Sequence, residues 1–176
     1  MSPPDPGRPV ADIDESRIRD WRPAPVQDRH YSGGHLLALA ADELFFAARG
    51  TYFGTTIGWP GIGADFWLVY RRLELDYLAE AFVGESLRTG VRAVGRSRRS
   101  LQLHQVLQSV AGAPRTIAVA RLIVVAFDVR TRASVALPDE LGQAIEAYEG
   151  PLARVDEVAA PATTSAPDRG LPIMSD

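Results

Sequence analysis

Residues 33–50 read GGHLLALAADELFFAARG, and the architecture expected for the whole chain depends on this run. The run contains no proline and no β-branched residue, and most of its residues favour helices. Apolar side chains cover nearly its whole circumference, so we expect a helix that is buried on most sides. Gly33 and Gly34 precede the helix, and Gly50 is expected to end it in a left-handed conformation. The run is too short and too acidic to cross a membrane.

The chain after this helix is typical of an antiparallel sheet. A loop rich in glycine is expected at residues 51–65, where it would shape one wall of a pocket. Alternation of polar and apolar residues then predicts four strands, with turns rich in glycine between them. The strands are expected at residues 66–77, 86–94, 101–110 and 116–128. The last of them is the most apolar and suits the centre of the sheet.

A short second helix is predicted to start within residues 137–141, with Pro138 at its first position. Leu141, Ile145 and Tyr148 would share one face of it. One long buried helix followed by four consecutive strands predicts an α+β fold, in which the sheet curls around the helix.

The 176 residues, 46% of them hydrophobic, suffice for one sizeable core. We expect one domain at residues 21–150, flanked by a flexible arm at residues 1–20 and a disordered tail at residues 151–176. Both flanks should be dispensable for folding, because their composition offers little to bury. Pro23 and Pro25 limit any strand in residues 21–31 to a sheet edge.

Composition excludes several classes of function. The chain has no cysteine, so disulfides, thiolate catalysis and cysteine-based metal sites are excluded. A formal charge of −3 with mixed signs gives no argument for nucleic acid or a membrane surface as partner. The three histidines lack metal-ligand spacing, so neither a metal nor a cofactor is expected. Without an apolar leader segment, a cytoplasmic location is the expectation.

Several spaced motifs resemble those of hotdog-fold thioesterases of the 4-hydroxybenzoyl-CoA thioesterase type. They are LELDYL at residues 73–78, VGESL at 83–87, VGRS at 94–97 and LPDEL at 137–141, and the similarity spans residues 31–148. The resemblance implies an antiparallel sheet wrapped around one central helix. It also implies hydrolysis of an acyl thioester carried by coenzyme A or by an acyl carrier protein. A homodimer or homotetramer is implied as well, since the family's pocket lies between two subunits.

The segment before the helix departs from the family pattern. The common pattern is D-x-x-G-H-V-N-N, followed by a helix that closes with A-R. Gly34 and His35 match the G-H pair, and Arg49 matches the closing arginine at the family's spacing. Tyr31 stands in place of the acid. A second branch begins with H-G-G, and there Gly33 and Gly34 match the glycine pair.

In that second branch the expected helix acid falls on Ala41, one residue before Asp42. The arrangement also resembles enediyne-type polyketide thioesterases. These lack the usual acid and use a helix arginine, at the position of Arg49, to help hold the thioester oxygen. The resemblance therefore implies a polyketide-type acyl chain as one candidate substrate.

Thioester hydrolysis needs a polarised carbonyl, and a helix N-terminus offers free N–H groups for its oxygen. Gly33 and Gly34 would allow substrate to approach that backbone closely, unless they only form a tight turn. On a helical period His35, Asp42 and Arg49 share one stripe, and successive members are seven positions apart. They are the candidate catalytic residues.

Each candidate also has a structural interpretation. Asp42 would serve as general base if burial raised its pKa. In the structural interpretation, Asp42 or Arg49 pairs with a charge from the sheet or from a partner subunit. His35 is a base or a helix-entry residue bonded to the backbone. Tyr31 donates to a carbonyl or packs. Arg96 and Ser97, in a basic turn, meet coenzyme phosphates or an acidic carrier protein, or form a solvated hairpin.

Two other functions remain open. The missing acid before His35 suits a hotdog subunit that binds an acyl thioester without cleaving it. A hotdog dehydratase is the third alternative, although the usual histidine and acid on the helix are not both present.

Overall fold

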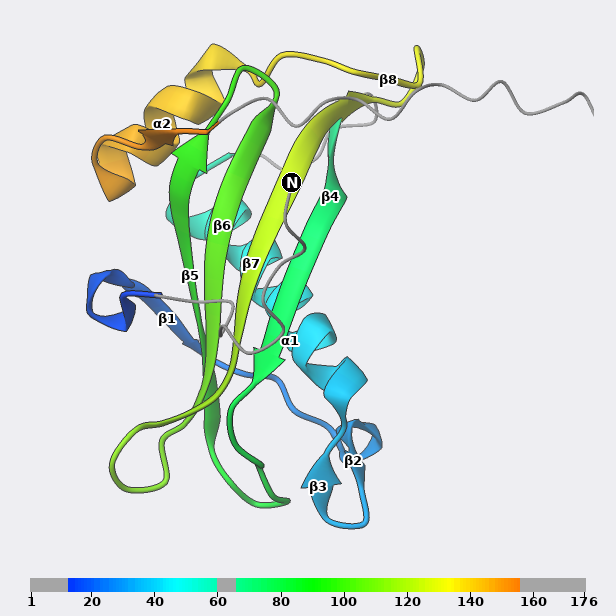
Figure 1. Cartoon of the computed structure of the whole chain (residues 1–176), viewed down its shortest axis with the longest axis vertical. Coiled ribbons are helices and arrows are strands. Elements are labelled where there is room, and N and C mark those ends of the chain that lie inside the picture. Colours follow the sequence, from blue (N-terminus) through cyan, green and yellow to red (C-terminus); the bar gives the residue numbers. More distant parts are fainter. Residues whose placement is uncertain (1–12, 60–65, 156–176) are drawn as a thin grey trace, which may run out of the picture.

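The structure is a computed structural model that describes residues 13–59 and 66–155. A curved antiparallel sheet forms one layer, and the long helix α1 lies across one face of it (Figure 1). In chain order the elements are η1 (Glu15–Arg17), β1 (Asp20–Pro23), η2 (Asp28–His30), β2 (Tyr31–Ser32), β3 (His35–Leu36), α1 (Ala38–Thr51), the π-helical turn η3 (Tyr52–Thr56), β4 (Phe66–Tyr77), β5 (Leu87–Arg96), β6 (Ser100–Ser109), β7 (Arg115–Asp128), β8 (Ala133–Ser134), α2 (Asp139–Glu149) and β9 (Ala153–Arg154).

The four predicted long strands are confirmed as β4 to β7, with ends that agree within two residues. The order across the sheet is β1-β5-β6-β7-β4, and all these neighbours are antiparallel. The prediction that the most apolar strand, β7, occupies the centre is wrong, because β6 lies there. Hairpins join β5, β6 and β7 in sequence, so β6 must lie between the other two.

The sheet and α1 share the core. Side chains on one side of α1 are buried against the sheet: Ala41, Leu44, Phe45 and Ala48. Full burial of a side chain such as Leu44 or Phe45 stabilises the fold by about 1.5–3 kcal/mol. The other side of α1 is open in the single chain, where Leu39 is 86% and Phe46 is 65% exposed. The prediction of burial on most sides is therefore wrong for one chain, because the sheet contacts only one side of the helix.

Both predicted ends of the helix are wrong. The helix begins at Ala38, and Gly33 and Gly34 instead form the turn between β2 and β3, with φ angles of 57° and 86°. Gly50 lies inside α1, which continues as the π-helical turn η3. Tyr52 accounts for the continuation, since its side chain is fully buried and its hydroxyl donates to Glu149 Oε1 at 2.7 Å. The loop expected from residue 51 therefore starts only after Thr56.

Residues 13–20 pack on the sheet. Ile18 is buried with Val106 and Val119, and the Glu15 carboxylate accepts hydrogen bonds from Gln108 at 2.6 Å and Thr116 at 2.7 Å. The packed unit thus begins before residue 20, and only residues 1–12 of the expected arm lie outside the described residues. The expected edge strand is confirmed as β1, which pairs with β5.

The second helix is confirmed as α2, with Pro138 as its N-cap, one residue before the predicted position. Leu141 and Ile145 are buried, and Tyr148 packs against the same cluster. At the other end of this region β9 pairs with β5, so the packed unit extends past residue 150; residues 156–176 of the expected tail lie outside the described residues. Within the described ranges, no helix is long and apolar enough to cross a membrane.

Candidate functional site

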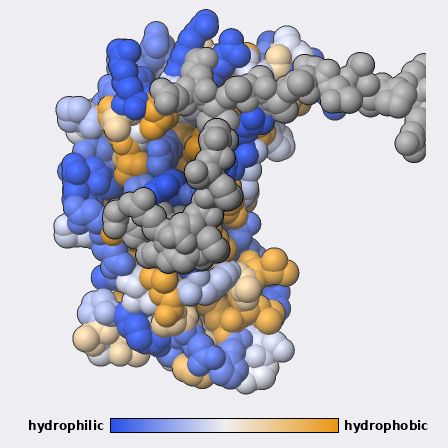
Figure 2. All heavy atoms as spheres, viewed as in Figure 1, coloured by the Kyte–Doolittle hydropathy of each residue, from blue (hydrophilic) through white to orange (hydrophobic). Residues whose placement is uncertain are grey.

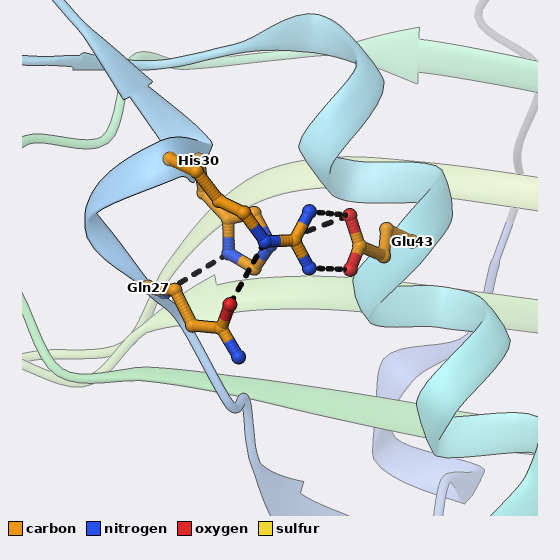
Figure 3. Close-up of polar contacts among 4 residues, drawn as sticks. Gln27, His30 and Glu43 are labelled. Carbon is orange, nitrogen blue, oxygen red and sulfur yellow. Dashed lines mark hydrogen bonds and ion pairs between the residues drawn. The ribbon is translucent and has the colours of Figure 1, made fainter.

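The segment that leads to α1 is fixed to the flank of this helix by a polar cluster (Figure 3). The Arg29 guanidinium donates to both carboxylate oxygens of Glu43, and this contact lowers the pKa of Glu43. The His30 side chain is buried; its Nδ1 accepts the Gln27 backbone N–H at 3.0 Å, and its Nε2 lies 3.4 Å from Glu43 Oε2. These contacts set where the β2–β3 hairpin begins.

The hairpin places His35 beside the end of the sheet. Gly33 and Gly34 turn the chain, and the Gly34 carbonyl accepts the Val83 N–H at 3.0 Å. Leu36 donates to the Ala81 carbonyl at 2.8 Å. The glycine pair therefore docks the hairpin on the segment after β4, and it lies four residues or more before the first residue of α1.

A cavity of about 400 Å³ lies where α1 begins, and we call it the helix-entry cavity. Its lining residues are His35, Leu36, Ala38, Tyr77, Leu78, Ala79, Glu80, Ala81 and Ile117. No side chain caps α1, whose N-cap is Leu37. Ala40 donates its N–H to the Leu37 carbonyl at 3.0 Å, whereas the N–H groups of Ala38 and Leu39 have no backbone partner among the described residues. The start of α1 therefore presents two donors and a positive dipole end. The cavity thus combines an apolar wall with an anion-stabilising end.

One titratable pair lies at this cavity. His35 Nδ1 lies 3.5 Å from Glu80 Oε1, and the His35 ring lies 4.9 Å from the Phe82 ring. Both His35 and Glu80 are exposed, so solvent reaches them. A carboxylate beside Nδ1 favours the tautomer that leaves Nε2 free to accept a proton.

The predicted stripe of three catalytic residues does not exist as a stripe. His35 belongs to β3, whereas Asp42 and Arg49 belong to α1. The Tyr70 hydroxyl donates to Asp42 Oδ1 at 3.4 Å, and Arg49 Cζ lies 4.6 Å from the Tyr70 ring centre. Asp42, Arg49 and Tyr70 form what we call the α1–β4 cluster, which is separate from His35.

Arg49 is only 5% exposed. Its Nη1 donates to Gln105 Oε1 at 2.6 Å, its Cζ lies 5.5 Å from the Phe46 ring centre, and its buried Nη2 has no hydrogen-bond partner among the described residues. Burial lowers the pKa of Arg49 to about 10, and the nearby Asp42 charge opposes that change. The guanidinium therefore has one donor group to spare in a region of low polarity.

Tyr77 lies near both the helix-entry cavity and Asp42 of the α1–β4 cluster. Its hydroxyl donates to the Ala38 carbonyl, and it also lines the helix-entry cavity. Burial, with a smaller contribution from Asp42, raises the pKa of Tyr77. Tyr77 thus lies between the helix-entry cavity and Asp42.

The remaining predicted site residues lie elsewhere. Tyr31 is half-buried in β2; its hydroxyl has no partner among the described residues, and burial raises its pKa. Arg96 Nε binds Glu146 Oε1 at 3.0 Å, and the Ser97 hydroxyl accepts the backbone N–H groups of the next turn residues. The turn itself is shorter than predicted, since Gly95 and Arg96 still belong to β5.

His104 faces away from α1. It pairs in register with Arg92 on β5 and Arg121 on β7, and burial between these two cations lowers the pKa of His104 to about 4. Figure 2 shows this face of the molecule, where polar and apolar patches alternate. Within the ranges that the structure describes, no group of three histidine or acidic side chains is placed to hold a metal ion.

Four residues of these sites were not predicted: Tyr70, Tyr77, Glu80 and Gln105. Tyr70 and Tyr77 are an odd number of residues apart, so alternation alone predicts opposite faces; the register shift between Tyr70 and Arg72 brings both to the α1 face. Glu80 follows β4 in an irregular segment, and Gln105 is a polar residue in a buried strand. A buried glutamine in a strand is a signal of a polar partner, because its amide must be hydrogen-bonded.

Comparison with solved structures gives consistent matches. A thioesterase of Thermus thermophilus, solved with coenzyme A and zinc, is 24% identical with a TM-score of 0.63, over 77% of this chain and 96% of that one. The PA5185 protein of Pseudomonas aeruginosa is 22% identical with a TM-score of 0.66, over 76% and 93%. The dynemicin thioesterase, whose structures concern polyene binding, is 15% identical with a TM-score of 0.65, over 78% and 98%.

Comparisons of the sequence with family models and with curated proteins give no match. The structural neighbours include several named thioesterases, and their identities are low. The curled antiparallel sheet and the single long helix are the features they share with this chain. The chain therefore has the α+β hotdog fold, the architecture that these thioesterases use.

Proposed function

We propose that this chain hydrolyses acyl thioesters and that the reaction takes place at the helix-entry cavity. One observation carries the proposal: an apolar cavity, an unblocked helix N-terminus and a histidine–carboxylate pair meet at one place in the chain. The fold supports it, since proteins of similar structure are named thioesterases.

In the proposed reaction, the thioester carbonyl oxygen lies against the first N–H groups of α1, at Ala38. These fixed donors stabilise the negative charge that the oxygen acquires when the carbonyl carbon is attacked. His35 Nε2 takes a proton from a water molecule, whose oxygen bonds to that carbon. Glu80 lies beside Nδ1 and orients the ring. Collapse of the intermediate breaks the carbon–sulfur bond, and the proton on His35 passes to the departing thiolate.

The α1–β4 cluster supplies the second part of the proposal. Arg49 lies eleven residues along α1 from Ala38, about 16 Å, so its spare Nη2 would contact the acyl chain of the substrate and not the reacting carbonyl. Asp42 is the alternative general base, because it lies four residues, about 6 Å, along α1 from Ala38 at the cavity. Tyr31, Gly33 and Gly34 contribute by shaping the hairpin that carries His35.

The proposed substrate is an acyl group on coenzyme A or on an acyl carrier protein, with a polyketide-type chain as one candidate. Coenzyme A in the structure of the Thermus thermophilus neighbour supports this choice, and so does the dynemicin thioesterase. We also propose a homodimer or homotetramer. Its support is the open apolar surface on α1 and β4, which a second copy would cover. The residues are Leu39, Phe46, Tyr70, Leu73 and Tyr77.

A second candidate is acyl binding without hydrolysis. The separation of His35 from Asp42 and Arg49 favours it, because no acid on α1 meets the histidine. Thiol release from a panel of aliphatic and aromatic acyl thioesters separates the two functions. Binding of an acyl-CoA without release of thiol would favour the binding subunit.

Variants then test the site. His35→Asn should lower kcat about 10²–10⁴-fold, since it removes a general base. Glu80→Gln should lower kcat less, because it removes only the orienting charge. The matched control is Glu140→Gln, which changes the charge in the same way on the exposed first turn of α2. If Asp42→Asn abolishes turnover and His35→Asn does not, the base is Asp42.

A further inference from the structure

A second cavity lies at the end of the sheet opposite to the helix-entry cavity. It has a volume of about 520 Å³ and lies between the β5–β6 turn, the segment before α2 and β9. In Figure 1 these elements are at the top, whereas β2, β3 and the start of α1 are at the bottom. Its polar lining consists of Arg96, Ser97, Arg98, Asp139 and Arg154, and we call it the arginine cavity.

The arginine cavity carries positive charge that the described residues do not neutralise. Arg96 is paired with Glu146 at 3.0 Å, and Asp139 contributes one negative charge to the lining. Among the described residues, neither Arg98 nor Arg154 forms an ion pair. Two unpaired guanidinium groups around one concavity repel each other unless an anion lies between them.

The backbone that carries these arginines is fixed on both sides. The Arg98 carbonyl accepts the Leu137 N–H at 2.9 Å, and the Arg96 carbonyl accepts the Val155 N–H at 3.1 Å. β9 pairs with β5 so that Arg154 lies next to Arg96. The cavity walls are therefore held by hydrogen bonds before any ligand arrives, which reduces the entropy lost on binding.

Arg96 is held as well. A Cβ atom added to Gly142 would lie 2.3 Å from Arg96 Nη1, so the guanidinium packs directly on the backbone of α2. With Arg96 occupied by Glu146, the two free guanidinium groups are those of Arg98 and Arg154. Arginine forms two parallel hydrogen bonds to a phosphate, which makes phosphate the best match for such a pair.

We propose that the arginine cavity binds the phosphate groups of an organic phosphate, through Arg98 and Arg154. Resting on the proposed function, the ligand is the phosphate-bearing end of coenzyme A or of a phosphopantetheine arm. The sequence predicted that Arg96 and Ser97 contact the phosphates. In this proposal Arg98 and Arg154 make these contacts instead. The two cavities lie at opposite ends of strands of ten residues or more, which are about 30 Å long or longer. A single substrate that fills both kinds of cavity would therefore use one cavity from each of two copies of the chain.

Calorimetric titration of the full chain with coenzyme A tests the proposal. The double variant Arg98→Gln with Arg154→Gln should bind coenzyme A at least about tenfold more weakly, because it loses the charge-assisted hydrogen bonds to phosphate. Arg132→Gln is the matched control; Arg132 is exposed in the β7–β8 turn and does not line the cavity. It should leave the Kd unchanged.

Further ligands identify the source of the phosphate. Pantetheine, which has no phosphate, should bind the wild type and the double variant equally. If the double variant loses binding of both 4′-phosphopantetheine and coenzyme A, the site holds the phosphate that is attached to the pantetheine arm. Retained binding of 4′-phosphopantetheine would indicate the nucleotide end of coenzyme A. Both results support the site.

Two results would overturn the proposal: equal coenzyme A binding by the double variant and the wild type, or an equal loss in Arg132→Gln. Turnover of a short N-acetylcysteamine thioester keeps the two proposals apart, since this substrate has no phosphate. Its hydrolysis should be the same in the double variant. If the wild type does not hydrolyse it but coenzyme A binding depends on Arg98 and Arg154, the phosphate site stands and the hydrolase does not.

Discussion

Replacing Arg49 by methionine should separate stability from activity. Burial lowers the pKa of Arg49 from 12.5 to about 10, which corresponds to about 3 kcal/mol of unfavourable free energy for the buried cation. The hydrogen bond to Gln105 returns about 1.5–3 kcal/mol, and the contacts with the rings of Tyr70 and Phe46 return about 0.5–2 kcal/mol. The charge of Arg49 therefore adds little to the stability of the fold.

Methionine fills the space of the aliphatic part of the arginine side chain and removes the buried charge. It also leaves Gln105 Oε1 without its donor, at a cost of about 1–3 kcal/mol. The free energy of unfolding of Arg49→Met should therefore change by no more than about 2 kcal/mol. The double variant Arg49→Met with Gln105→Met removes both partners of this bond, but also the bond from Gln105 Nε2 to the Phe45 carbonyl at 3.0 Å, so its stability should lie within about 1.5 kcal/mol of the single variant.

Turnover should respond very differently. If Nη2 of Arg49 holds the acyl chain of the substrate, Arg49→Met should lower kcat/KM about 10–10²-fold, which is the loss of one charge-assisted hydrogen bond. Arg49→Lys should also be impaired, since it keeps the charge but loses the planar fork. Urea denaturation and thiol release measure the two effects. Wild-type turnover together with a loss of more than about 3 kcal/mol in stability would refute this reasoning and make Arg49 a structural residue.

Three further outcomes follow from the packing. Ile18→Ala should lower the free energy of unfolding by about 2–3 kcal/mol in urea, whereas Arg17→Ala on the exposed side should leave it nearly unchanged. The pKa of His104 is about 4 in the folded chain, below its ordinary value of 6.5, so the unfolded chain binds the proton more readily. Stability is thus full above pH 6.5 and falls as the pH drops towards 4, by less than about 3 kcal/mol because solvent screens the site; His104→Gln should remove this dependence. Tyr52→Phe should lower Tm, since the Glu149 carboxylate loses a buried donor worth about 1–3 kcal/mol, whereas Tyr148→Phe should not.

The local rules predicted the sheet well because they act on long segments. Alternation in residues 66–77 matches β4 residue for residue, and the apolar run at 116–128 matches β7 within one residue. Turn glycines such as Gly84 and Gly112 take positive φ angles, as expected. The position of each strand in the sheet was predicted less well. The strand order depends on how the hairpins connect the strands, and not on how apolar one strand is.

The helix ends could not be predicted from the same rules. Gly50 favours a helix end by its own propensity, yet the buried ring of Tyr52 and its bond to Glu149 continue the helical path. Glu149 lies 97 residues away in the chain, so no local pattern reveals this contact. Tertiary packing overrides the local preference here.

The placement of the candidate site depends on the other glycine pair. Periodicity counted from residue 33 put His35 on the helix, in line with Asp42 and Arg49. The positive φ angles of Gly33 and Gly34 instead close a hairpin, because Val83 and Ala81 offer backbone partners that a helix start would not use. This places His35 beside Glu80 and out of line with Asp42 and Arg49. The residue types of the site were therefore readable from the sequence, whereas their grouping required the long-range backbone bonds that fix the hairpin to the end of β4.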